Sequence, residues 1–284
     1  MDEVRSVGVV GAGTMGNGIA HVLALSGYET ILIDHEQRVL DQAITTIRTN
    51  LERQRKKEIV TAEQVHNTQE RIKTNTTLES VKHCQVVIEA IIEKTDLKRK
   101  LFSELSAIVD KECCLASNTS TISITEIASA AKYPGKVIGM HFMNPVPMMK
   151  LVEVVRGLQT SDETYFTIKH VAEQMGKVPV LVKDSPGFIS NRILMPMINE
   201  AILSLEEGIA EPEAIDTIMK LGMSHPMGPL ELADLIGLDV CLSIMKVLHQ
   251  DFGDSKYRPA PLLTRMVAAG YLGRKSRRGF YSYQ

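Results

Sequence analysis

The feature that most constrains the fold is the glycine motif Gly11-Ala-Gly-Thr-Met-Gly16 near the start of the chain. The apolar run Ser6–Val10 precedes it directly and is typical of a buried strand, and residues 17–25 are typical of a helix. A G-x-G-x-x-G motif between a strand and a helix indicates dinucleotide binding, because its glycines permit a tight turn and the close approach of a pyrophosphate. We therefore predict cofactor contacts from Gly11, Ala12, Gly13, Thr14, Met15 and Gly16.

The acidic residue Asp34 supports the same interpretation. It follows a second strand pattern, Glu29–Ile33, and lies 18 residues after Gly16. A carboxylate at this place binds the ribose hydroxyls of NAD, and it would repel the 2′-phosphate of NADP. NAD is therefore the expected cofactor, and NADP is less favoured, although Arg38 nearby leaves it open.

Residues 36–82 are longer than a strand–helix–strand crossover requires. Apolar residues recur at helical spacing over residues 39–51, and a second helical pattern covers residues 61–71. We predict a hairpin of two helices that projects from the sheet as an arm. Its basic residues include Arg53 and Lys57. They form either a solvated face or a clamp for an anionic ligand, and both interpretations stay open at this point.

Further strand patterns occur at residues 85–90, 113–116 and 178–182, so the first part of the chain predicts an α/β fold. The expected architecture is a Rossmann-type, doubly wound, mainly parallel sheet over residues 1–184. The polar residues Glu93, Lys98 and Ser120 follow strands at the carboxyl edge of the sheet, where ligands bind in such folds. After a linker at residues 183–187 the pattern is helical, which predicts an all-α domain over residues 185–284.

The stretch of residues 136–155 contains a candidate pair of catalytic side chains. Residues 137–140 form an apolar run that ends on His141, and Glu153 interrupts a second apolar run at residues 151–155. A lone buried acid is costly unless another group pairs with it, and His141 is the nearest ionisable residue. A histidine held by a buried carboxylate has the fixed tautomer that a general base needs. The alternative is a core histidine and a carboxylate that caps backbone groups.

Composition excludes several other classes of protein. The formal net charge of −2 gives no basic field for nucleic acid. The 4 cysteines form no C-x-x-C pair, which argues against a zinc site and fits a reducing compartment. No apolar run approaches the ~18 residues that span a bilayer, and the N-terminus does not resemble a signal peptide. We expect a cytoplasmic protein that binds no metal, no nucleic acid and no membrane.

Six segments together resemble one family, the L-3-hydroxyacyl-CoA dehydrogenases, and in particular the stand-alone bacterial 3-hydroxybutyryl-CoA dehydrogenases. The resemblance covers about residues 5–283. The segments are GAGTMGNGIA, VIEAIIE, SNTSTISITEIA, GMHFMNPVPMMKLVEVV, KDSPGFISNRILMPMINEA and GPLELADLIGLD.

The resemblance implies a set of functional residues. A His–Glu pair that performs the proton chemistry corresponds to His141 and Glu153, and the substrate-contacting Ser and Asn correspond to Ser120 and Asn191. Asn144 matches a residue near the nicotinamide and the substrate. The implied NAD contacts are the glycine motif, Asp34, Glu93, Lys98, Ser120, Asn144 and Lys275, and the implied coenzyme A contacts are Arg53 and Lys57.

The activity that this resemblance implies is the NAD-dependent oxidation of a short (S)-3-hydroxyacyl-CoA, or the reverse reduction, by a homodimer assembled through its helical domain. Two other functions are weighed against it: oxidation of a free hydroxy or polyol acid on the same scaffold, and NAD binding without catalysis. The chain departs from many relatives at Met143 and at Ser276-Arg277. The second departure concerns only the contacts of the basic tail.

Overall fold

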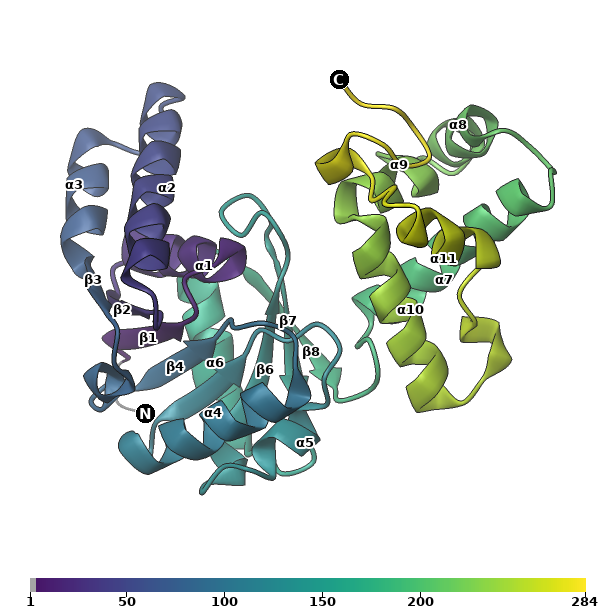
Figure 1. Ribbon diagram of the computed structural model, residues 1–284. Helices are drawn as coiled ribbons and strands as arrows, with labels where there is room; N and C mark the ends of the chain where they lie inside the picture. Colours follow the sequence, from purple (N-terminus) through teal and green to yellow (C-terminus); the bar gives the residue numbers. More distant parts are fainter. Residues whose placement is uncertain (1–3) are drawn as a thin grey trace. The chain divides into compact units, whose positions relative to one another are not determined.

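The computed structural model describes residues 4–284, which divide into two compact units, residues 4–184 and Ser185–Gln284 (Figure 1). The first unit is built on an 8-stranded sheet in the order β3-β2-β1-β4-β5-β6-β7-β8. Its strands are β1 (Ser6–Val10), β2 (Glu29–Ile33), β3 (Ile72–Asn75), β4 (Val86–Glu89), β5 (Cys114–Ser117), β6 (Val137–Phe142), β7 (Leu151–Arg156) and β8 (Val178–Lys183).

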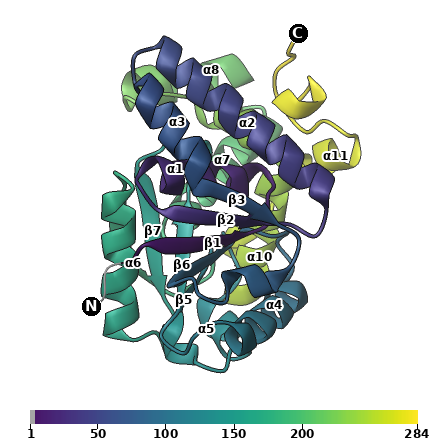
Figure 2. The ribbon, with the colours of Figure 1, turned by 90° about the vertical axis from the view of Figure 1, so that its left-hand side faces the viewer.

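Helices cover both faces of this sheet. The helices of the first unit are α1 (Thr14–Leu25), α2 (Gln37–Lys56), α3 (Ala62–Arg71), α4 (Thr95–Ile108), α5 (Ile124–Ala128) and α6 (Asp162–Gln174). The core on one face joins side chains of α1, α2 and α6, such as Ile19, Leu40 and Ile168, to alternate residues of the strands. Helices α4 and α6 lie on opposite sides of the sheet (Figure 2). The predicted α/β fold is therefore confirmed.

Strand direction changes only toward one edge of the sheet. The pairs from β3 through to β6 are parallel, β6 and β7 are antiparallel, and β7 and β8 are parallel again. Strand β1 lies between β2 and β4, so the strand order reverses beside it. In open α/β sheets this reversal opens a crevice at the carboxyl ends of the strands, which is where the glycine motif lies.

The region of residues 36–82 contains the two predicted helices and one strand that the sequence did not indicate. Strand β3 pairs in parallel with β2, with Ile72 opposite Thr30. Its sequence, Ile72-Lys-Thr-Asn75, is short and polar, and three of its four residues are exposed. An edge strand of this kind has no alternating apolar pattern, because one row of its backbone groups faces solvent. The prediction of a purely helical region was wrong on this point.

The second unit is a helical bundle, as predicted for a helical C-terminal domain. Its helices are α7 (Ser190–Glu206), α8 (Pro212–Gly222), α9 (Pro229–Ile236), α10 (Leu238–Phe252) and α11 (Pro261–Ala268). Their core includes Met195, Ile198, Leu230, Leu242 and Leu248. None of the helices in residues 4–284 is long and apolar enough to span a membrane.

The C-terminal tail packs against its own unit through two buried carboxylates. The backbone N–H groups of Phe280 and Tyr281 donate to Asp234, each at 3.0 Å. The Tyr281 hydroxyl donates to Asp216 at 2.8 Å, and Asp216 also accepts the N–H groups of Leu230 and Glu231 at the start of α9. The basic side chains of residues 274–278 are exposed.

Candidate active site

The glycine motif forms a tight turn between β1 and α1. Gly11 has a φ of +100°, and a Cβ there would lie 2.6 Å from the carbonyl oxygen of Ala90. A Cβ on Gly16 would lie 1.7 Å from the carbonyl oxygen of Gly11, so both positions require glycine. Nothing lies within 4 Å of the Cβ position of Gly13, and no side chain caps the start of α1. The open N–H groups of this helix N-terminus fit a pyrophosphate.

Asp34 lies directly beside this turn. Its Oδ2 accepts the N–H of Ala12 at 2.9 Å, and its Oδ1 accepts the N–H of Glu36 at 3.2 Å. His35 Nδ1 lies 3.1 Å from Oδ1, and the Asp34 side chain is 13% exposed. The carboxylate therefore holds the glycine motif in place and still has an exposed edge at the position where a ribose-binding acid is expected.

His141 and Glu153 meet across the antiparallel pair of β6 and β7. The two residues are directly opposite each other in the register, and His141 Nδ1 lies 2.8 Å from Glu153 Oε2. His141 is 6% exposed and Glu153 is 2% exposed. The other ring nitrogen, Nε2, lies 3.1 Å from Ser120 Oγ. With Nδ1–H donating to the carboxylate, Nε2 is left to accept a proton, which is the arrangement of a general base.

Glu93 holds the segment that carries Ser120. One of its oxygens, Oε1, accepts the Ser120 N–H at 2.9 Å, the Thr119 hydroxyl at 2.5 Å and the Thr121 N–H at 3.1 Å. Burial alone would raise the pKa of Glu93, but Lys98 and these donors outweigh burial and lower it. The carboxylate is therefore ionised at neutral pH, and it positions the hydroxyl that faces His141.

A buried ion pair lies behind Glu93. Lys98 Nζ lies 2.5 Å from Glu89 Oε1 and 3.3 Å from Glu93 Oε2, and the Lys98 side chain is 1% exposed. Glu89 Oε2 accepts the Ser117 hydroxyl at 2.6 Å. Burial raises the pKa of Glu89, while Lys98 and Ser117 oppose the shift. The Lys98 ammonium lies in the interior, where it orients Glu93. The predicted direct contact of Lys98 with the cofactor stays a prediction.

Sequence reasoning missed Glu89 and Asn118. Glu89 follows three apolar residues at the end of a strand, but its partner is nine residues away on a helix, and no local spacing reveals that contact. Asn118 Oδ1 accepts the N–H of Phe142 at 2.9 Å, which fixes the end of β6 next to His141. Both residues lie at the carboxyl ends of neighbouring parallel strands, where ligand sites form, and this position could have indicated their role in the sequence.

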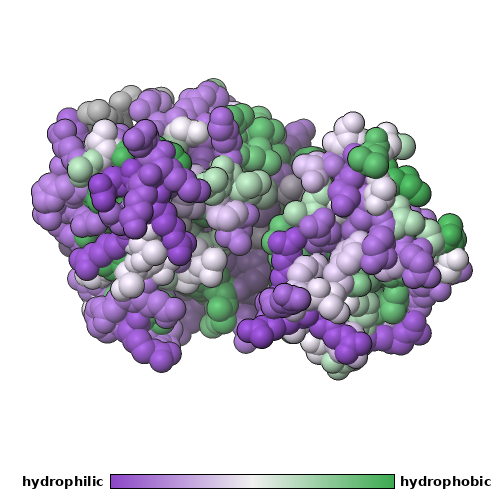
Figure 3. All heavy atoms as spheres, turned by 90° about the horizontal axis from the view of Figure 1, so that it is seen from above, coloured by the Kyte–Doolittle hydropathy of each residue, from purple (hydrophilic) through white to green (hydrophobic). Residues whose placement is uncertain are grey.

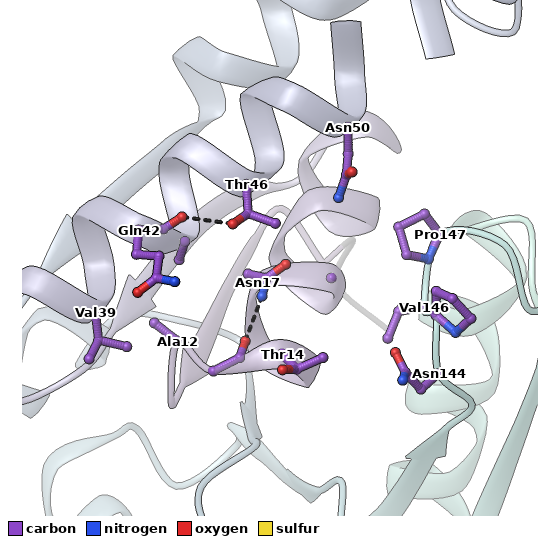
Figure 4. A pocket seen from close by; sticks show the side chains of 14 residues that line it. Ala12, Thr14, Asn17, Val39, Gln42, Thr46, Asn50, Asn144, Val146 and Pro147 are labelled. Atoms are coloured by element: carbon purple, nitrogen blue, oxygen red, sulfur yellow. Dashed lines mark hydrogen bonds between the residues drawn. The ribbon is translucent and has the colours of Figure 1, made fainter. Parts of the chain in front are cut away.

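A cavity of about 370 Å³ lies between the glycine motif, α2 and the loop after β6 (Figure 4). Gln42, Thr46 and Asn50 line it from α2, and Asn144 and Pro147 face them from the loop. Arg53, in the last turn of α2, and Lys57, directly after the helix, are both exposed. The structure thus brings Asn144 to the same cavity as the glycine motif, whereas the role of the two basic residues stays a prediction.

Asn191 and Lys275 belong to the second unit. Asn191 is a buried residue in the first turn of α7. Lys275 Nζ donates to Asp239 Oδ2 at 2.7 Å, within the same unit. Their predicted contacts with substrate and cofactor stay predictions. No group of metal-ligating side chains occurs within residues 4–284.

Two family descriptions match consecutive parts of the chain. "3-Hydroxyacyl-CoA dehydrogenase, NAD binding domain" matches residues 6–185, and "3-hydroxyacyl-CoA dehydrogenase, C-terminal domain" matches residues 187–283. The chain therefore belongs to the 3-hydroxyacyl-CoA dehydrogenase family, and it is an oxidoreductase with NAD as its cofactor. The family and the cofactor predicted from the sequence are confirmed.

Individual relatives are similar over nearly the whole chain. A probable 3-hydroxybutyryl-CoA dehydrogenase of Deinococcus radiodurans is 55% identical over 97% of this chain and 99% of its own. The 3-hydroxybutyryl-CoA dehydrogenase of Bradyrhizobium diazoefficiens is 53% identical over 99% of this chain and 96% of its own. The crystal structure of (S)-3-hydroxybutyryl-CoA dehydrogenase from Ralstonia eutropha has a TM-score of 0.97 at 50% identity and covers 99% of this chain and 100% of its own.

Proposed function

We propose that this protein oxidises short (S)-3-hydroxyacyl-CoA thioesters, such as 3-hydroxybutyryl-CoA, to 3-ketoacyl-CoA, and reduces acetoacetyl-CoA in the reverse direction. The observation that carries the proposal is the hydrogen-bonded chain from Ser120 through His141 to Glu153. The names of the relatives that are 50–55% identical support the short acyl chain.

His141 is the general base in the direction of oxidation. Its Nε2 removes the proton of the 3-hydroxyl group, and its Nδ1–H remains bonded to Glu153. The buried carboxylate stabilises the imidazolium that results, because opposite charges attract strongly where water is scarce. NAD, held by the glycine motif and Asp34, would supply the acceptor for the hydride of C3, and the role of His141 is to take the hydroxyl proton so that the carbonyl can form.

Three further residues hold the substrate in this proposal. Ser120, 3.1 Å from Nε2 of His141, donates a hydrogen bond to the reacting oxygen. Asn144 orients the substrate from the loop after β6, and Asn191 is assigned to the thioester end. The assignment of Asn191 rests on its match to the family motif.

The coenzyme A moiety follows one face of α2. Thr46, Asn50 and Arg53 follow one another at spacings of four and three residues, which places them on one side of α2. Lys57 comes four residues after Arg53, directly after the end of the helix. Thr46 and Asn50 line the cavity of Figure 4, and the two basic residues continue beyond it into solvent. Within residues 4–284 no acidic side chain forms an ion pair with Arg53 or Lys57. The hydrophilic end of this arm is visible at the left of Figure 3. Such charges suit the phosphates of coenzyme A.

A homodimer is the proposed assembly. The helical unit exposes several large apolar side chains, and some of this apolar surface is visible at the right of Figure 3. Surface of this kind suits a symmetric interface. The residues include Ile193, Ile209, Ile218, Leu221, Met223 and Leu235. Light scattering at micromolar concentration should give the mass of two chains, and the mass of one chain would contradict the proposal.

A substrate panel tests the activity. Acetoacetyl-CoA, longer 3-ketoacyl-CoA thioesters and free acetoacetate are each assayed with NADH and with NADPH. We expect the highest kcat/KM for acetoacetyl-CoA with NADH. Equal turnover of the free acid would reject the thioester assignment.

Variants of the pair test the mechanism. His141→Ala and Glu153→Gln should each lower kcat for oxidation by roughly 10²–10⁴-fold, the usual contribution of a positioned general base. NADH binding should persist in both. His170→Ala is the control, since it removes an exposed histidine of α6. A Glu153→Gln variant with full activity would show that His141 and Glu153 are not a working pair.

A further inference from the structure

The loop of residues 143–150 forms one wall of the cavity that faces α2. It leaves β6 after Phe142, carries Asn144 and returns to the sheet as β7. Within the loop, the N–H groups of Met148 and Met149 both donate to the carbonyl oxygen of Pro145, at 3.0 and 3.1 Å. Val146 is buried against Gly18 of α1, where an added Cβ would lie 3.0 Å from that of Val146. These contacts fix the first half of the loop to α1, and other contacts must hold its second half.

The side chain of Lys177 connects the two halves of the loop of residues 143–150. The residue lies between the end of α6 and the start of β8, and its own N–H donates to the carbonyl oxygen of Ala172. Its Nζ donates to the carbonyl oxygen of Val146 at 2.5 Å and to that of Met149 at 2.8 Å. The next residue, Val178, donates its N–H to the carbonyl oxygen of Lys150, so the backbone beside Lys177 is tied to the same loop.

The ammonium of Lys177 is a costly group at this place. The residue is 8% exposed, and no ion pair joins it to a carboxylate within the described residues. Burial lowers the pKa of Lys177. The neighbouring His21 has its pKa lowered to about 4, chiefly by burial and further by the charge of Lys177, so its imidazole is neutral at pH 7. A buried charge requires strong acceptors, and charged donors form hydrogen bonds about twice as strong as neutral ones.

We propose that Lys177 is a positioning residue for the acyl-CoA substrate, whose ammonium holds the loop of residues 143–150 in the shape that completes the substrate cavity. The inference rests on the proposed function, since it assigns the cavity to the thioester. Lys177 does not contact the substrate. It joins the Val146 and Met149 carbonyls, and thereby fixes Asn144 and Pro147 opposite α2. A displacement of about 1 Å in such a wall is sufficient to lower kcat/KM about 100-fold, and because the loop contacts the substrate and not the transferred proton, the loss should appear mainly in KM.

Steady-state kinetics of Lys177→Met test this role. Methionine is an unbranched apolar side chain only one atom shorter than lysine, and it has no donor for either carbonyl. We expect KM for acetoacetyl-CoA to rise about 10- to 100-fold. The dissociation constant of NADH, measured by its fluorescence, should rise by a clearly smaller factor, because Asn144 is the one residue of this loop among the expected NAD contacts. Lys169→Met is the matched control, because Lys169 forms only an exposed pair with Glu173 on α6.

The kinetic pattern separates positioning from a loss of folded protein. A lower folded fraction reduces the apparent kcat and leaves both KM values unchanged. If Lys177→Met yields no folded protein, Lys177→Gln replaces it, because its amide is too short to join both carbonyls and the same rise in KM is expected. A folded variant with the KM of the unmodified protein would overturn the inference. If the unmodified protein does not turn over acyl-CoA thioesters, the proposed function fails instead.

Discussion

His21 provides a quantitative test of the packing around the cofactor helix. It lies on α1 and is 1% exposed. Burial, with a smaller contribution from Lys177, lowers its pKa from 6.5 to about 4 and outweighs the Gln54 side chain, which acts in the opposite direction. The unfolded chain therefore binds a proton between pH 6.5 and 4 that the folded chain does not bind, and the free energy of unfolding must fall as the pH falls through this range.

The magnitude follows from the size of the shift. One pKa unit corresponds to about 1.4 kcal/mol, so the full loss below pH 4 is about 3 kcal/mol, and the loss between pH 7 and pH 5 is about 2 kcal/mol. In His21→Gln this position does not titrate. The decrease in unfolding free energy from pH 7 to pH 5 should therefore be about 2 kcal/mol smaller in the variant than in the unmodified protein.

Urea unfolding followed by circular dichroism at the two pH values measures this difference, since the chain has no tryptophan to report by fluorescence. Subtracting the pH dependence of the His21→Gln variant from that of the unmodified protein removes the contribution of the other 7 of the 8 histidines. His66→Gln, at an exposed position of α3, is the control for the substitution itself. Equal pH dependence of the His21→Gln variant and the unmodified protein would refute the reasoning, as would an NMR titration in which His21 gains its proton above pH 6.

Three further outcomes are expected. Asp34→Ala should narrow the preference for NADH over NADPH by about 10-fold in kcat/KM, because it removes one charged hydrogen-bond acceptor and a repulsive charge; an unchanged ratio would count against a ribose contact. Lys98→Met should lower the free energy of unfolding by about 3–5 kcal/mol, since it leaves the Glu89 carboxylate buried without its cation, and adding Glu89→Leu should recover much of the loss in urea denaturation. Tyr281→Phe should lower the stability of the helical unit by about 1.5–3 kcal/mol, because the hydroxyl donates to the buried carboxylate of Asp216, and a thermal melt unchanged by the substitution would contradict this.

The sequence was sufficient wherever a function depends on local spacing. The glycine motif, its helix and Asp34 are close in the chain, and the turn they form needs residues without a Cβ at fixed places. His141 and Glu153 were predicted as a pair because a lone acid in an apolar strand needs a partner. The antiparallel register of β6 and β7 then supplies the contact between them.

Other parts of the site depend on contacts that no local pattern encodes. Strand β3 is polar and belongs to the sheet only because β2 is available to pair with it. Glu89 and Lys98 are ordinary charged residues in the sequence, and their burial results from the packing of α4 on the sheet. Lys177 could not be distinguished from any surface lysine, because its acceptors are backbone carbonyls about 30 residues earlier in the chain.

Because β7 runs antiparallel to β6, the catalytic pair and the substrate-specificity loop depend on different parts of the structure. His141 and Glu153 are brought together by backbone register, and each strand is also held from its far side, β6 by β5 and β7 by β8. A slip by one residue would turn Val152 or Val154 toward the imidazole, so the register has little freedom to drift. The loop between the strands is held instead by contacts of its backbone, chiefly those of Lys177 with the Val146 and Met149 carbonyls, and these contacts do not depend on the loop's own side chains. A lineage of these enzymes can therefore change the loop side chains that line the cavity, accept a different acyl group and keep its proton-transfer pair intact.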